Sequence, residues 1–125
     1  MLSRPFGLTV LAILAGSESV QSSVLDCVFS ERCQPSIGCQ TDSLHLTFEY
    51  TEAKDDASVD DEGRIAPVLA HVGPDVISFI DIPANGQVLV TSIQIADGTA
   101  VHSRHGTLMG ILYPSQYLGQ CERHP

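Results

Sequence analysis

Four cysteines carry the clearest chemistry in this 125-residue chain: Cys27, Cys33, Cys39 and Cys121. An even number of cysteines in a short exported chain is typical of disulfides. Pro35 and Gly38 lie between Cys33 and Cys39, so this segment can turn back and bring the two sulfurs together. We therefore predict the disulfides Cys33–Cys39 and Cys27–Cys121. The alternative is a zinc site in which the cysteine thiolates are the ligands. Structural zinc sites use paired ligands about two to four residues apart, and we predict no metal here.

His102 and His105 are the second candidate, because imidazole nitrogens are common metal ligands. Side chains alternate between the faces of a strand, so residues three apart share an ion only if a bulge or turn intervenes. A two-residue turn at Asp97-Gly98 would place His102 beside Ile93 on the core face. A longer loop, shifted by one residue, would place it outside. We predict no metal at this pair.

Acidic side chains form a third group. Residues 52–62 are rich in carboxylates that could bind Ca²⁺, namely Asp55, Asp56, Asp60, Asp61 and Glu62. They lack the alternating order of an EF-hand, so we expect a hydrated connection between strands and leave calcium binding open. Asp81 is a lone acid in the apolar segment 76–82, two residues before Pro83. We expect it near a strand end with its carboxylate in water.

Motifs of activated nucleophiles do not occur after the N-terminal segment: the sequence has no Gly-x-Ser-x-Gly, no phosphate-binding glycine loop and no Cys-x-x-Cys. We predict no catalytic residues and no cofactor. A small secreted metal-dependent hydrolase that uses His102, His105 or the acidic stretch is the alternative. Fifteen acidic and six basic residues give a net charge of −9, which disfavours nucleic acids and anionic lipid surfaces as partners.

The N-terminus has the layout of a secretory signal peptide. Arg4 precedes an apolar stretch over residues 6–16, and small or polar residues follow at Ser17, Glu18 and Ser19. The apolar stretch is too short to span about 30 Å of hydrocarbon. We predict a signal peptide over residues 1–19, cleaved near residues 17–23, and a periplasmic or secreted protein. Residues 20–125 are expected to form a single domain, because two domains would each have too small a core.

The remaining sequence predicts short strands separated by turns, with no helical periodicity over three turns. Apolar residues alternate with polar ones over residues 44–50, the pattern of a strand with one buried face. Further strands are expected over 65–72, 76–82, 86–96, 99–105, 107–113 and 117–122. Pro67 lacks an N–H, which predicts an edge strand or a bulge. About seven or eight antiparallel strands result, as a β-sandwich or a small closed β-barrel.

A partner-binding surface is predicted on the hairpin around Asn85-Gly86, a dipeptide typical of two-residue turns. Pairing outward from this turn sets Ile82 against Leu89 and defines one face as the core. The opposite face then carries further apolar side chains, including Phe79, Val88 and Val90. We expect these three residues to bind a protein partner or a second copy of the chain.

Three segments together resemble a family of small exported proteins of alphaproteobacteria that has no assigned activity. They are Asp26-Cys27-Val-Phe with two further cysteines soon after, residues 96–105 (Ala-Asp-Gly-Thr-Ala-Val-His-Ser-Arg-His), and residues 114–122 (Pro-Ser-Gln-Tyr-Leu-Gly-Gln-Cys-Glu). The chain is more distantly similar to periplasmic lysozyme inhibitors, which are small disulfide-tied β-barrels, but it lacks their Ser-Gly-x-x-Tyr pattern. The resemblance implies export, and inhibition of a lysozyme only by analogy of class.

These observations lead to one expectation for function. The protein is predicted to be an exported, non-enzymatic β domain that binds another macromolecule in the periplasm or cell envelope. The hydrolase and a lysozyme-inhibitor-like protein are the alternatives.

Overall fold

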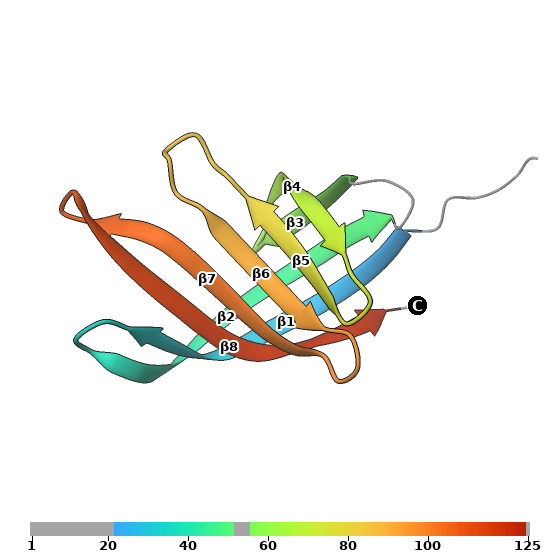
Figure 1. The fold of residues 1–125 in the computed structure, drawn as a ribbon, viewed down its shortest axis with the longest axis horizontal. Coiled ribbons are helices and arrows are strands. Elements are labelled where there is room, and N and C mark those ends of the chain that lie inside the picture. The colour runs from blue at the N-terminus through green and yellow to red at the C-terminus, as the bar shows by residue number, and fades with distance from the viewer. Residues whose placement is uncertain (1–21, 52–55, 125) are drawn as a thin grey trace, which may run out of the picture.

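The computed structural model describes residues 22–51 and 56–124, and the predicted signal peptide lies outside these residues. The described chain forms a closed antiparallel barrel in which each strand pairs with its neighbours in sequence and the last pairs with the first (Figure 1). This confirms the all-β prediction and selects the barrel over the sandwich. The strands are β1 (Ser22–Gln34), β2 (Gly38–Thr51), β3 (Asp56–Asp61), β4 (Arg64–Val72), β5 (Val76–Asp81), β6 (Leu89–Gln94), β7 (Thr99–Leu108) and β8 (Ile111–His124).

The barrel has two different ends. The connections β1–β2, β3–β4, β5–β6 and β7–β8 lie at one end, which we call the mouth end. The start of β1 and the end of β8 lie at the other, which we call the terminal end (Figure 1). Two connections at the mouth end are two-residue turns in which both residues have positive φ, Glu62-Gly63 and Met109-Gly110. Within the described residues, no helix is long and apolar enough to cross a membrane.

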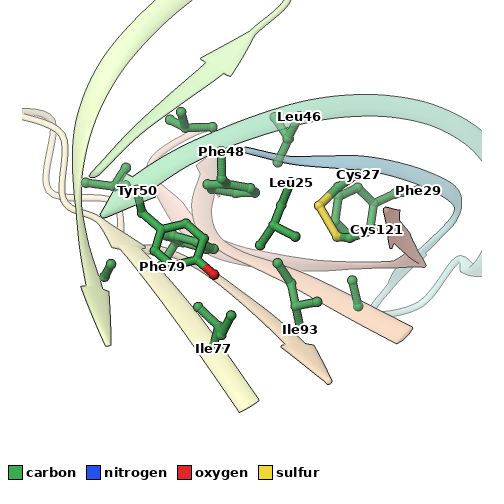
Figure 2. Packing of buried hydrophobic residues seen from close by; sticks show 14 of the residues in the cluster. Leu25, Cys27, Phe29, Leu46, Phe48, Tyr50, Ile77, Phe79, Ile93 and Cys121 are labelled. Atoms are coloured by element: carbon green, nitrogen blue, oxygen red, sulfur yellow. A yellow bond between two sulfur atoms is a disulfide. The ribbon is translucent and has the colours of Figure 1, made fainter. Parts of the chain in front are cut away.

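Both predicted disulfides are confirmed. Cys27–Cys121 joins the directly opposed β1 and β8 inside the barrel, over a sequence separation of 94 residues (Figure 2). Cys33–Cys39 closes the β1–β2 hairpin at the mouth end. Disulfides form and persist in oxidising compartments, so the structure indicates an extracytoplasmic protein.

Aromatic side chains fill the barrel interior. The predicted alternation over residues 44–50 is confirmed, because Leu46, Phe48 and Tyr50 of β2 all point inward and are buried (Figure 2). Phe48 stacks on Phe79 with 4.3 Å between the ring centroids, and Tyr50 meets the same ring edge-on at 5.5 Å. Such pairs add to the free energy gained by burying the rings themselves. Together with the disulfide, they form the buried core of the barrel.

The predicted register of the β5–β6 hairpin is wrong by one residue. Leu89 pairs with Asp81 rather than with Ile82, because β5 ends before Pro83 and β6 begins only at Leu89. The connection is therefore longer than two residues, and it is held by a hydrogen bond from Gly86 N to the Pro83 carbonyl, 3.2 Å. A one-residue shift exchanges the faces of a strand.

The exchange of faces overturns part of the predicted partner surface. Phe79 is 1 % exposed and belongs to the core, so it cannot form an outer face. Val90 pairs with Ile80 on the opposite face of the hairpin and is half-buried, as is Val88 in the connection. A partner role for Val88 and Val90 remains a prediction.

Two other expectations also change. Residues 56–61 of the acidic stretch form β3 rather than a hydrated connection, while Asp55 lies outside the described residues. The edge predicted from Pro67 exists only locally. β5 pairs with β4 over residues 69–72. Pro67 precedes this paired part, so no N–H at residue 67 is needed for a hydrogen bond to β5.

Candidate functional site

A cavity of about 310 Å³ lies in the mouth half of the barrel. Strand alternation creates it: inward positions that carry large rings in the middle of the barrel carry smaller or polar side chains toward the mouth. Its apolar lining includes Leu46, Phe48, Val59, Ala66, Val68, Phe79 and Leu89. Its polar lining is Asp61, Arg64, Asp81, Thr91, His102 and Arg104. The cavity thus has apolar walls, two buried polar side chains in Thr91 and His102, and charged side chains at its rim.

His102 is the buried polar residue at the centre of this site. It lies on the core face of β7, opposite Thr91 rather than Ile93. The β6–β7 connection is longer than a two-residue turn, which shifts the predicted pairing by two residues. A shift of two residues leaves each side chain on the same face of its strand. The His102 side chain is 3 % exposed, and its ring lies 5.7 Å from that of Tyr117. The alternative in which His102 points outward is therefore wrong.

The hydrogen bonds of His102 fix its protonation state. Arg104 Nε donates to His102 Nε2 at 2.9 Å, so this nitrogen carries a lone pair. The ring proton is then on Nδ1, which lies 2.6 Å from Thr91 Oγ1 and donates to it. Burial, and secondarily the neighbouring Arg104 guanidinium, lowers the pKa of His102 from 6.5 to about 3. His102 is a neutral acceptor for Arg104 at physiological pH.

Arg104 is held in one position by its neighbours. Besides the bond to His102, its guanidinium lies over the Tyr117 ring, 5.2 Å from the ring centroid, and 3.9 Å from an Asp61 carboxylate oxygen. The side chain is 28 % exposed and lines the cavity. Because only Nε is used by His102, the terminal guanidinium nitrogens remain able to bind an acceptor in the cavity.

The rim of the cavity carries balanced charge. Asp61 and Arg64 lie opposite each other in the strand register at the β3–β4 turn, and Asp81 ends β5, near a strand end as predicted. Asp81 is half-buried and lines the cavity. With Arg104, the rim has two arginines and two aspartates and is formally neutral.

A second hollow lies beside the cavity, between β4 and β5. Their pairing covers residues 69–72 of β4, and the two strands diverge over the part of β4 that precedes residue 69. This hollow of about 840 Å³ lies over the divergence, with Pro67, Leu69 and Ile82 in its lining. It shares Arg64 and Arg104, among others, with the cavity, so the two spaces are adjacent.

Other sequence candidates do not converge on one site. His105 is exposed while His102 is buried, which confirms that the two point to opposite faces. Asp56, Asp60 and Asp61 are spread along β3, and Asp60 accepts a hydrogen bond from Gly63 N at 2.8 Å.

One cluster with metal-ligand spacing occurs among the described residues. It combines Glu31 with Cys33 and Cys39. Both sulfurs are in a disulfide, so they do not offer thiolates to a metal.

A separate polar cluster lies outside the barrel near the terminal end. The Asp26 carboxylate accepts hydrogen bonds from His45 Nε2 at 2.6 Å, Thr47 Oγ1 at 3.0 Å and His124 Nε2 at 3.2 Å. The hydrogen bond from His45 makes the largest contribution to lowering the pKa of Asp26. The cluster joins β1 to both of its neighbours.

Sequence reasoning missed Arg104 and Thr91. The available signal was the alternation Ala100, His102, Arg104, which places all three on one face once His102 is known to point inward. Comparison with known protein families, with curated sequences and with solved structures finds no match to this chain.

Proposed function

We propose that this protein is an exported, non-enzymatic binding protein that holds a small amphipathic molecule in the barrel cavity. The ligand would have an apolar body and an anionic head group such as a carboxylate. The observation that carries the proposal is the placement of Arg104, fixed by a neutral histidine at the rim of an apolar cavity. Export is supported by the disulfides and by the layout of the N-terminus.

The size and lining of the cavity favour a small ligand. Ligand sites in proteins usually occupy about 300–1,000 Å³ and combine apolar walls with a few fixed polar groups. The cavity of about 310 Å³ falls at the lower bound, and a larger hollow adjoins it. Eight-stranded barrels have an interior that is either filled by side chains or able to hold one small ligand.

The chemistry of Arg104 favours an anionic head group. Charge-assisted hydrogen bonds from a guanidinium are about twice as strong as neutral ones, and a carboxylate can accept two in parallel. Asp61, the acidic partner of Arg104, is 3.9 Å away, beyond direct hydrogen-bond distance. A ligand carboxylate within hydrogen-bond distance would therefore interact more strongly than Asp61 does.

The state of His102 favours binding over catalysis. A general base needs a free lone pair and a pKa near the working pH. The Nε2 lone pair of His102 is occupied by Arg104, and its pKa is about 3. In this arrangement, His102 serves as a positioning residue for Arg104.

Fluorescence titration with 1-anilinonaphthalene-8-sulfonate, an aromatic anion, tests the proposal. We expect saturable binding that Arg104→Met weakens by about tenfold or more, since a charged hydrogen bond contributes about 1.5–3 kcal/mol. The matched control is Arg123→Met, at the terminal end, where Arg123 donates to Tyr50 Oη. Ala66→Phe, which fills the cavity, should abolish binding.

Two results would contradict the proposal. One is equal affinity of the Arg104→Met and Arg123→Met variants. The other is probe binding that Ala66→Phe leaves unchanged although its urea unfolding matches that of the parent. Competition by saturated carboxylates of increasing chain length then defines the apolar body, because affinity should stop rising once the cavity is full.

A further inference from the structure

The turn between β7 and β8 carries a compact group of exposed aliphatic side chains, which we call the apolar tip. Its members are Leu108 (56 % exposed), Met109 (93 %), Ile111 (71 %) and Leu112 (65 %). The turn projects from the mouth end of the barrel (Figure 1). Contiguous exposed apolar side chains commonly mark an interaction surface.

The apolar side chains surround the tip rather than forming one face. Leu108 and Ile111 are paired and share a face, whereas Leu112 pairs with Thr107 on the other face and Met109 occupies the turn itself. A flat protein surface would cover only one face. A lipid interface can surround the whole tip. The β7–β8 strand pairing continues to Leu108 and Ile111, next to the turn, so insertion would remove few unpaired peptide groups from water.

The charge around the tip favours the same medium. Residues 98–121 contain no aspartate or glutamate, although the whole chain has a net charge of −9. The only arginine in this segment, Arg104, lies at the cavity rim. Insertion of the tip would therefore carry no carboxylate out of water. The negative charge elsewhere on the chain opposes anionic lipids and favours a zwitterionic surface.

The dimensions also fit. Two residues on each side of the turn, at about 3.3 Å per residue, give a wedge about 7 Å deep. Interfacial elements commonly bury about 5–10 Å into the boundary between head groups and acyl chains. Tyr113 Oη donates to the Pro35 carbonyl at 3.1 Å and ties the wedge to the β1–β2 turn, where Ile37 is also exposed.

We propose that the apolar tip inserts into the surface of a zwitterionic phospholipid bilayer. This docking would place the mouth end, and with it the cavity, next to the lipid. The docking itself does not depend on the proposed function, because it can be measured with no cavity ligand present.

Flotation with extruded phosphatidylcholine vesicles tests the inference. The processed protein, recovered from an oxidising host, is used with its N-terminus defined by intact mass. We expect it to float with the vesicles, and Ile111→Asp to reduce the partition coefficient by about tenfold or more. The matched control is Ile95→Asp, an exposed isoleucine in the β6–β7 connection at the other end of the barrel, which should float like the parent.

Several outcomes would overturn the inference. One is a parent protein that does not float with phosphatidylcholine, and another is equal flotation of the two variants. Binding only to vesicles with one-fifth phosphatidylglycerol, abolished by salt, would show electrostatic adsorption instead. Sedimentation velocity that shows dimers lost in Ile111→Asp, together with no flotation, would assign the tip to a second copy. Matching circular dichroism of the two variants excludes misfolding, and probe binding in the cavity is measured separately.

Discussion

The neutral state of His102 makes the stability of the barrel depend on pH, and His102→Gln should remove that dependence. Burial, and to a lesser extent Arg104, lowers the pKa of His102 from 6.5 to about 3 in the folded protein. In the unfolded chain the same ring takes up a proton near pH 6.5. Between these two values the unfolded state binds one more proton than the native state. The free energy of unfolding therefore falls as the pH falls through this window.

The magnitude follows from the width of the window. Each pH unit within it changes the free energy of unfolding by about 1.4 kcal/mol. Between pH 7.5 and pH 5, His102 should therefore remove about 2 kcal/mol. With a urea slope of about 2 kcal/mol per molar, the unfolding midpoint should fall by roughly 1 M.

Urea unfolding followed by circular dichroism at the two pH values measures this loss. The glutamine side chain of His102→Gln can still accept a hydrogen bond from Arg104 and donate one to Thr91, but it does not titrate. The remaining histidines are the same in both proteins, so their effects cancel in the comparison. Equal losses of free energy in parent and variant on acidification would refute a neutral His102 in the folded barrel. Titration of the His102 ring protons above pH 5 in NMR spectra would refute it as well.

Three further perturbations test other parts of the structure. Replacing Cys27 and Cys121 together by alanine should cost about 4–5 kcal/mol, measured by urea unfolding, because the bridge closes a loop of nearly the whole barrel. Gly119→Ala should cost about 1–3 kcal/mol in the same assay, since a methyl group there would collide with the β1 backbone. Asp26→Asn should cost less than about 1 kcal/mol at pH 7, because the carboxylate is partly exposed. That difference should disappear as the pH falls through the lowered pKa of Asp26, because the hydrogen bond from His45 is then to a protonated group.

Local sequence patterns predicted most of the strands but not all of them. Residues 56–61 were expected as a connection and form β3, and the strand expected over 107–113 is wrong because it contains the β7–β8 turn at Met109-Gly110. The alternation over residues 44–50 and the turn residues between Cys33 and Cys39 are short-range signals, and both were confirmed. The predicted β5–β6 register is wrong because Asn85-Gly86 lies in a longer connection and does not form a two-residue turn. The longer connection shifted every pair by one residue and moved Phe79 from the outer surface to the core.

The candidate site was harder to predict, since it depends on pairings that the local pattern does not contain. Arg104 becomes a site residue only when β7 is known to pair with both β6 and β8. Those pairings place it beside Leu89 and near the ring of Tyr117. An isolated arginine in a mixed polar segment has no signal of its own. His102 was identified from its residue type, but its role as a neutral acceptor required the hydrogen bonds of the folded state.

The placement of the free space explains why the proposed ligand site and the proposed lipid contact belong to the same end of the molecule. Buried rings and the Cys27–Cys121 disulfide occupy the terminal half, whereas the cavity lined by Arg104 lies in the mouth half. A groove of about 360 Å³ runs there between the first and last hairpins, lined by Ile37, Leu108 and Arg104. The lining of this groove includes Leu108 of the apolar tip and Arg104 of the cavity rim, so the proposed lipid contact and the proposed ligand site lie beside the same groove. A cavity at the terminal end would not share this groove with the apolar tip.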